Sequence, residues 1–176
     1  MGHIRQLSEN LANKIAAGEV VERPASVIKE LTENSIDAKA KSITILVEQG
    51  GTSKMCVIDD GIGMNRADAL LCFSRHATSK IVGENDLFNI TTLGFRGEAI
   101  PSIASISVFT LETNNGEENT KVEYEFGKRK NVGSVAMNRG TKITVERIFQ
   151  NVPARLKYMK SINAEFAAIY LSLIHI

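Results

Sequence analysis

Tryptophan is absent from the 176-residue sequence, and only two cysteines, three histidines and three prolines occur in it. Cys56 and Cys72 form no CxxC pair and lie in apolar runs, so we expect two small buried side chains in a reducing compartment. The histidines lie far apart along the chain and show no metal-ligand spacing. A disulfide framework and a zinc site of histidines and cysteines are therefore excluded.

Long apolar runs and an excess of one charge are missing as well. No stretch approaches the length of a membrane span and the N-terminus has no signal-type apolar segment, so we expect a soluble intracellular protein without membrane contact. The net charge of +1 neither indicates nor excludes a nucleic-acid surface, and the cluster Lys128-Arg129-Lys130 is typical of a solvated loop or strand end. No GxxxxGK[ST] stretch occurs, which excludes a P-loop nucleotide site.

Hydrophobic residues make up 43% of the chain, which is enough for one domain with a packed core. Helices dominate the predicted first half and hairpin-like strands the second. This order predicts an α+β fold, a two-layer sandwich with helices on one face of a mixed, mainly antiparallel sheet. Apolar periodicity and turn residues predict helices over 7–17, ended by Gly18, and over 24–37, 65–73, 98–104, 154–159 and 164–173, and strands over 42–48, 54–58, 105–112, 121–126, 132–137 and 142–148.

Three carboxylates and an amide share one face of the helix predicted over 24–37. They occur at i, i+3, i+4 and i+7 and fall within an arc of roughly 100°, beside an apolar arc that can face the core. Lys29 is expected to point away from this face, so no cation of the chain would balance its charge. A solvated polar face and a cation site remain alternatives at this point, since magnesium takes oxygen ligands. The four residues are Glu30, Glu33, Asn34 and Asp37.

The stretch Asp59-Asp60-Gly61-Ile62-Gly63 follows an apolar strand. Glycine allows close approach of a ligand, and a carboxylate at a strand end can accept a hydrogen bond from an amino group such as that of adenine. A plain turn would give the same pattern, so the motif alone is weak. Residues 75–97 then form a long segment with few periodic signals, which indicates a functional or mobile loop. Its last part, Gly94-Phe95-Arg96-Gly97, precedes a predicted helix and could present backbone N–H groups to an anion.

Taken in order, these blocks resemble the N-terminal ATPase region of the MutL family of DNA mismatch repair proteins. Residues 11–27 resemble the N-terminal sequence of that family at almost every position, and the resemblance covers about residues 3–170. The gyrase-like lid and the GxGL lid of sensor kinases are both absent, which separates the chain from other members of the wider ATPase superfamily. The further matching blocks are 29–38, Asp59 to Met64, Arg75 to Lys80, Gly94 to Ala99, Gly140-Thr141 and Asn151-Val152-Pro153-Ala154-Arg155.

The resemblance implies a role for each matching residue. Glu30 would activate the water that attacks the γ-phosphate of ATP, and Asn34 would ligate Mg²⁺. Asp59 would accept from the adenine amino group, Gly61 and Gly63 would leave room for the base, and Thr141 would support the adenine side. The residues that would cover the phosphates are Thr78, Ser79, Lys80, Gly94, Phe95, Arg96, Gly97 and Glu98. Asp37 and Met64 complete the implied nucleotide site.

The resemblance also implies a Bergerat-type ATP-binding fold and the setting of the protein. Family members use ATP with Mg²⁺ in a cycle that couples mismatch recognition to repair. They form a homo- or heterodimer on ATP binding and work with a MutS-type mismatch-recognition protein and DNA, in the bacterial cytoplasm or the eukaryotic nucleus. They are much longer, with a second subdomain and a C-terminal dimerisation domain. We therefore expect residues 1–176 to be a fragment, the first subdomain alone, which binds ATP and hydrolyses it poorly.

Two residues depart from the family pattern. Lys39 stands where the family often has glycine after Asp-Ala, and Pro101 stands in the first turn of a predicted helix. Proline is tolerated there, so a local change is expected rather than loss of the site. Two other functions stay open: a nucleotide- or partner-binding fragment without turnover, and another ATPase of the superfamily, such as a topoisomerase subunit or a chaperone.

Overall fold

The computed structural model describes residues 2–75, 83 and 98–176. Six helices and six strands are described, together with one short 3₁₀ turn, η1 (Gln49–Gly51). The helices are α1 (Glu9–Val20), α2 (Pro24–Asp37), α3 (Arg66–Leu71), α4 (Ala99–Ser105), α5 (Pro153–Lys157) and α6 (Ile162–Ile174). The strands are β1 (Ile43–Glu48), β2 (Lys54–Asp59), β3 (Val108–Asn114), β4 (Asn119–Glu125), β5 (Lys128–Gly133) and β6 (Gly140–Glu146).

The strands form one sheet in the order β1-β2-β6-β3-β4-β5, and every described pairing is antiparallel. Three hairpins supply most of this order: β1 with β2, β3 with β4, and β4 with β5. The last strand, β6, inserts between β2 and β3, far from its neighbours in sequence. The insertion brings the end of β2 and the start of β6 side by side, where the candidate site lies.

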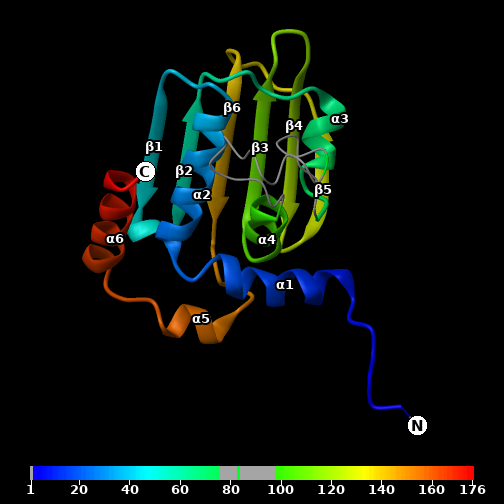
Figure 1. Ribbon diagram of the computed structural model, residues 1–176, viewed down its shortest axis with the longest axis vertical. Coiled ribbons are helices and arrows are strands. Elements are labelled where there is room, and N and C mark those ends of the chain that lie inside the picture. Colours follow the sequence, from blue (N-terminus) through cyan, green and yellow to red (C-terminus); the bar gives the residue numbers. More distant parts are fainter. Residues whose placement is uncertain (1, 76–82, 84–97) are drawn as a thin grey trace.

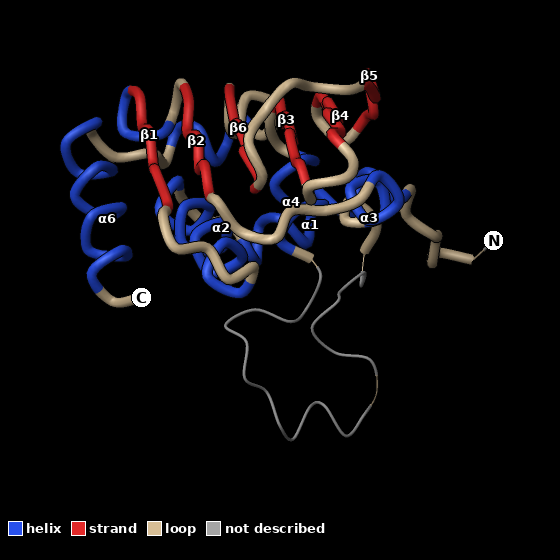
Figure 2. The backbone as a smooth tube through the Cα atoms, turned by 90° about the horizontal axis from the view of Figure 1, so that it is seen from above, coloured by secondary structure: helices blue, strands red, loops and turns tan. Residues whose placement is uncertain are grey.

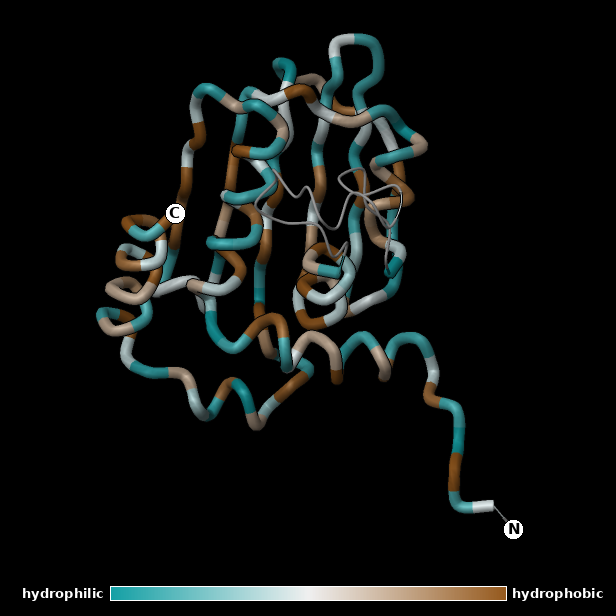
Figure 3. The backbone as a smooth tube through the Cα atoms, viewed as in Figure 1, coloured by the Kyte–Doolittle hydropathy of each residue, from teal (hydrophilic) through white to brown (hydrophobic). Residues whose placement is uncertain are grey.

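The helices α1 to α4 lie on one face of the sheet, which confirms the predicted two-layer α+β class (Figure 1, Figure 2). α6 lies at the β1 edge, beside α2 and η1. The core fills the space between the layers and includes fully buried residues of α2, α4 and the central strands. In Figure 3 apolar residues run along these strands and along α6, whereas the hairpin between β3 and β4 is polar. Among the described residues no helix has the length and apolar character needed to cross a bilayer.

The helix α2 carries the predicted acidic face, and its bounds match the prediction. Pro24 occupies the first turn, where its missing N–H costs nothing. Val27, Ile28 and Leu31 are at most 2% exposed and bind the helix to the sheet. The polar face of α2 lies beside this buried stripe, as the spacing predicts, and its four residues are half-buried.

Several predicted boundaries were wrong, and two of them have a clear structural cause. Gly18 does not end the first helix, because α1 continues to Val20 and the Gly18 carbonyl accepts a hydrogen bond from Arg155 Nη2 at 2.6 Å. The strand predicted over 132–137 spans Lys128–Gly133 instead, because the tight turn at Phe126 and Gly127 (φ 47° and 87°) lets the chain pair with β4 at once. The basic cluster 128–130 therefore starts an exposed edge strand.

Candidate functional site

A polar cluster lies at the end of the sheet where β2 ends, β6 begins and β3 ends. The antiparallel register sets Asp59 opposite Thr141, and Thr141 opposite Thr113. All three side chains belong to the helix-covered face, because their positions alternate with those that face outward. Residues about 80 positions apart are thus brought together only by the insertion of β6.

The Asp59 carboxylate is held from two elements. Its Oδ2 accepts from the Ser35 hydroxyl of α2 at 2.7 Å. Its Oδ1 accepts from the backbone N–H of Gly61 at 2.9 Å and of Thr141 at 3.3 Å. These hydrogen bonds hold the carboxylate between α2 and β6.

The neighbouring Asp60 points elsewhere. Its Oδ1 accepts from the backbone N–H groups of Lys41 at 2.7 Å and Ser42 at 2.9 Å. These bonds, led by that from Ser42, hold the pKa of the Asp60 carboxyl below its usual value. Asp60 thus closes the loop before β1, whereas Asp59 faces the cluster.

The glycines of this loop are required by close backbone packing. A Cβ on Gly61 would stand 2.7 Å from the Ala38 carbonyl oxygen at the end of α2. Gly63 has φ of 69°, and a Cβ there would overlap the Asn114 carbonyl at the end of β3. Gly140 has φ of 135°, and a Cβ there would overlap the Asp59 carbonyl. The sequence predicted space for a base at Gly61 and Gly63, and the structure adds that these glycines let the loop contact α2 and β3.

The Thr113 hydroxyl links the remaining parts of the cluster. It accepts from the backbone N–H of Met64 at 2.9 Å and lies 3.0 Å from the Thr141 hydroxyl and 3.2 Å from the Gly140 carbonyl. One arrangement satisfies all three contacts: Thr141 donates to Thr113, and Thr113 donates to Gly140. Met64 and Thr141, both predicted site residues, are therefore joined through a residue that was not predicted.

The polar face of α2 carries Glu30, Asn34 and Asp37, and each makes further polar interactions. Ser35 connects this helix to Asp59, so the face and the cluster form one region. The expectation that Lys29 points away was wrong: its Nζ lies 3.2 Å from Glu33 Oε1 and 4.0 Å from Glu30 Oε1. The long lysine side chain reaches back along the helix, and an i,i+4 spacing allows the Glu33 contact. Part of the negative charge is thus balanced within the chain.

Several predicted residues lie outside the described part of the chain. These are Thr78, Ser79, Lys80, Gly94, Phe95, Arg96 and Gly97. The flanking residues are described: Arg75 Nη2 lies 3.8 Å from Glu98 Oε1, and the Glu98 carbonyl accepts from Ser102 N–H at 3.0 Å. Glu98 thus stands directly before α4. Pro101 sits in the first turn of that helix and does not break it, as expected.

Two residues of the Asp59 cluster, Ser35 and Thr113, were not predicted. Ser35 is 4% exposed, on the buried side of α2, and a buried serine needs a hydrogen-bond partner. Its position within the acidic motif could therefore have indicated a contact with the site. Thr113 is fully buried on β3, and only the register of the folded sheet sets it beside Thr141.

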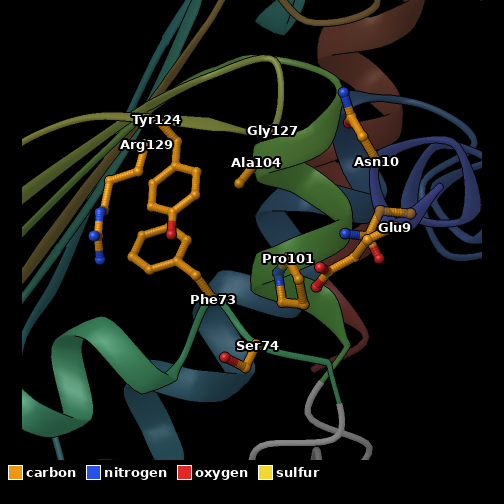
Figure 4. A pocket seen from close by; sticks show the side chains of 10 residues that line it. Glu9, Asn10, Phe73, Ser74, Pro101, Ala104, Tyr124, Gly127 and Arg129 are labelled. Atoms are coloured by element: carbon orange, nitrogen blue, oxygen red, sulfur yellow. The ribbon is translucent and has the colours of Figure 1, made fainter.

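A pocket of about 470 Å³ lies on the β4–β5 side of α4, apart from the Asp59 cluster (Figure 4). Phe73 stacks on Tyr124 there at 4.1 Å between ring centroids. Glu9 of α1 stands across the pocket from these rings. None of the residues predicted for the site lines this pocket, which is formed by Glu9, Asn10, Asn13, Phe73, Ser74, Pro101, Ala104, Tyr124, Gly127 and Arg129.

The Asp59 carboxylate has acceptor capacity beyond its contacts within the described residues. An ionised carboxylate accepts about four hydrogen bonds, and Asp59 accepts three within the described residues, which leaves one position on Oδ2 for an amino group. The described part of the chain holds no group of three or more histidine, cysteine, aspartate or glutamate side chains suited to a metal ion.

Comparison with known proteins agrees with this geometry. Residues 22–158 match the family of histidine kinase-, DNA gyrase B- and HSP90-like ATPases. The chain is 54% identical over 96% of its length to the DNA mismatch repair protein MutL of Halalkalibacterium halodurans, and 57% identical over 94% to that of Geobacillus kaustophilus. It spans 27% and 26% of these relatives, about a quarter of their length.

Solved structures give the same result for the fold. The MutL ATPase domain of Aquifex aeolicus in complex with ADP has a TM-score of 0.63 and 30% identity, over 88% of this chain and 54% of that chain. The N-terminal domain of a DNA repair protein has a TM-score of 0.75 and 28% identity, over 90% of this chain and 46% of that one. The predicted resemblance is confirmed: the chain belongs to the histidine kinase-, DNA gyrase B- and HSP90-like ATPase family, and the relatives it matches there are MutL proteins.

Proposed function

We propose that this chain is the first, nucleotide-binding subdomain of a MutL-type mismatch repair ATPase. The observation that carries the proposal is the Asp59 carboxylate, held by Ser35 of α2 and the Thr141 backbone with one acceptor position to spare. This carboxylate lies beside α2, which carries three polar residues predicted for the site. The chain is also 54% identical to a MutL protein. Adenine would bind at Asp59, with Gly61, Gly63, Met64 and Thr141 around the base.

The phosphates would lie along the polar face of α2 toward the start of α4. Asn34 would hold Mg²⁺, which would neutralise phosphate charge and orient the chain of phosphates. Glu30 would accept a proton from the attacking water, and Asp37 would support the nucleotide side of the helix. Glu98 and the residues 78–80 and 94–97 would cover the phosphates. Phosphoryl transfer depends on such positioning and charge neutralisation more than on covalent chemistry of the protein.

Base recognition is tested by a matched pair of neighbours. Asp59→Asn keeps the size of the side chain but reduces its acceptor capacity, so ATP affinity and the preference for ATP over GTP should fall. Asp60→Asn changes a carboxylate that bonds to the Lys41 and Ser42 backbone, and should leave both unchanged. Affinities are measured with a fluorescent ATP analogue and competing nucleotides. Equal loss in both variants, or in neither, contradicts the assignment of Asp59.

Hydrolysis is tested in a chain extended by the next subdomain of a MutL relative. Glu30→Ala should keep ATP binding and abolish phosphate release, because the water loses its base. Glu33→Ala is the control, since Glu33 lies on the same helix and shares the Lys29 contact. If Glu33→Ala stops turnover as fully as Glu30→Ala, Glu30 is not the specific base.

A second candidate function is nucleotide binding without turnover. It is favoured by the length of the solved MutL ATPase domains, of which this chain covers 51% to 54%. Steady-state phosphate release by the 176-residue chain that Glu30→Ala abolishes would rule it out.

For the whole protein we propose ATP-dependent dimerisation and cooperation with a MutS-type protein and DNA in the cytoplasm of a bacterium. The relatives at 54% and 57% identity are bacterial proteins named for DNA mismatch repair, which supports this setting. Deletion of the gene should raise the spontaneous mutation rate. An unchanged rate would favour another ATPase of the superfamily.

A further inference from the structure

The segment Asn151-Val152-Pro153-Ala154-Arg155 has no role in the proposed function. It follows a buried turn after β6, in which Ile148 and Phe149 are each 1% exposed, and it runs into α5. We call these five residues the brace. Its two polar side chains, Asn151 and Arg155, both reach the last turn of a helix that lies against the sheet.

The first helix held by the brace is α4, at its C-terminal end. A helix of seven residues has little stability of its own, so tertiary contacts determine where it lies. Its last four carbonyls all accept hydrogen bonds, and one of the donors is Asn151. Ser105 Oγ donates to Ser102 at 2.6 Å, Ser107 Oγ to Ile103 at 2.7 Å, Gly127 N to Ala104 at 2.9 Å and Asn151 Nδ2 to Ser105 at 2.9 Å.

The second helix is α1. Arg155 Nη2 donates to the Gly18 carbonyl at 2.6 Å, in the last turn of that helix. A guanidinium at a helix C-terminus satisfies an orphan carbonyl and interacts favourably with the helix dipole. Since α1 also packs on α4, the brace fixes the ends of two contacting helices to one point.

The opposite end of α4 follows Glu98, which belongs to the phosphate side of the proposed nucleotide site. The Ser102 N–H donates to the Glu98 carbonyl at 3.0 Å, so Glu98 moves with the helix. A helix transmits a displacement over its length, here roughly 10 Å at about 1.5 Å per residue. A shift of the brace would therefore move Glu98 on the phosphate side of the proposed site, and would leave the Asp59 cluster in place.

We propose that Asn151 and Arg155 are positioning residues for the nucleotide phosphates. They hold α4 and α1 at their C-terminal ends, so that Glu98, at the start of α4, keeps the position that phosphate binding needs. The proposal rests on the proposed function, and it predicts an effect on ATP that adenosine does not share.

The decisive variant is Asn151→Asp, which has the same size but turns a carboxylate oxygen toward the Ser105 carbonyl. Asn131→Asp on exposed β5 is the matched control for the added charge. Affinities for ATP and adenosine are measured by competition against a fluorescent ATP analogue, at a temperature where circular dichroism shows each variant folded. The dissociation constant for ATP should rise about tenfold in Asn151→Asp, as expected for loss of one hydrogen bond, with that for adenosine unchanged.

Arg155 gives an independent test if Asn151→Asp does not fold. Arg155→Met should weaken the binding of ATP and leave that of adenosine unchanged, and Arg155→Lys should keep most of the ATP affinity. Lys157→Met, on the same short helix, should change neither affinity. A purely structural brace would lower the melting temperature and leave the ratio of ATP to adenosine affinity unchanged, which overturns the proposal. Failure of the unaltered chain to bind ATP would instead overturn the proposed function.

Discussion

Lys39 adopts a backbone conformation that favours glycine. It follows α2 with φ of 63°, its N–H donates to the Ile36 carbonyl at 2.9 Å, and the Ala40 N–H donates to Ser35 at 3.2 Å. This pair of bonds is a Schellman motif, in which the residue after the cap takes a left-handed conformation. The family's frequent glycine at this position is thereby explained, and the lysine keeps the same backbone geometry at a cost in free energy.

We predict that Lys39→Gly raises the free energy of unfolding by about 1 kcal/mol, since a left-handed residue with a Cβ costs roughly that much. Urea denaturation measures the change. Lys41→Gly is the control, because Lys41 is not among the described residues with positive φ, and glycine there should destabilise the fold. Destabilisation by Lys39→Gly would contradict the assigned strain.

Cys72 shows how burial controls the chemistry of a single side chain. Cys56 is 2% exposed, as predicted for a small buried side chain. Cys72 is only partly buried. Burial, with a smaller effect of Asp68, raises the pKa of the Cys72 thiol to about 12.

We therefore predict that Cys72 does not react with a thiol reagent at pH 8 while the chain is folded, because almost no thiolate is present. Colour development with a disulfide reagent, before and after addition of denaturant, measures this. Rapid labelling of Cys72 in the folded chain, identified by mass spectrometry, would refute it.

Among the elements, α6 is joined to the start of α2 by an ion pair. Arg23, just before α2, donates to both oxygens of Glu165 on α6, at 2.9 and 3.3 Å. The turn η1 fits between these helices because Gly50 and Gly51 have no side chain: a Cβ on Gly50 would stand 2.8 Å from the Ile162 carbonyl. The position of α2, and so of its polar face, therefore depends on residues near the end of the sequence.

The Glu165 pair predicts a pH dependence. Burial alone raises the pKa of Glu165, but hydrogen bonds from Arg23 and the Lys160 backbone outweigh it and hold the pKa below its usual value. The stability that it contributes is thus present above the ordinary glutamate pKa, about 4.3, and is lost as the pH falls through the lower folded value. Glu165→Gln should cost about 2 kcal/mol at pH 7, and the difference from the unaltered chain should shrink below pH 4.

Chemical denaturation across this pH range provides the measurement. Glu117→Gln, a change in the exposed loop between β3 and β4, should show no such dependence. A Glu165→Gln difference that stays constant down to pH 3 would show that the carboxylate is not stabilised by Arg23.

At the scale of the whole molecule, nucleotide binding should stabilise the fold. The Asp59 cluster joins β2, β6, β3 and α2, so a ligand there binds the folded chain and not the unfolded one. At 100 times its dissociation constant such a ligand adds about 2.7 kcal/mol to the free energy of unfolding.

We predict this gain for ATP with Mg²⁺, and little change for Mg²⁺ alone, because the described residues hold no cluster of three acidic or other metal-binding side chains. Thermal denaturation with Mg²⁺, with ATP plus chelator, and with both compares the contributions. Equal stabilisation by Mg²⁺ alone would reveal a metal site independent of nucleotide.

Local periodicity, turn residues and ordered motifs were enough to predict the class of fold, the bounds of α2 and the family. The apolar stripe of Val27, Ile28 and Leu31 predicts the buried side of α2 without any knowledge of the sheet. The contacts of the side chains became known only from the folded chain. Folding inserted β6 beside β2, which sets Thr113 and Thr141 at Asp59, extended α1 past Gly18, and turned Lys29 back to Glu33. These outcomes depend on hydrogen bonds between residues distant in sequence and on flexible side chains, neither of which leaves a periodic signal along the chain.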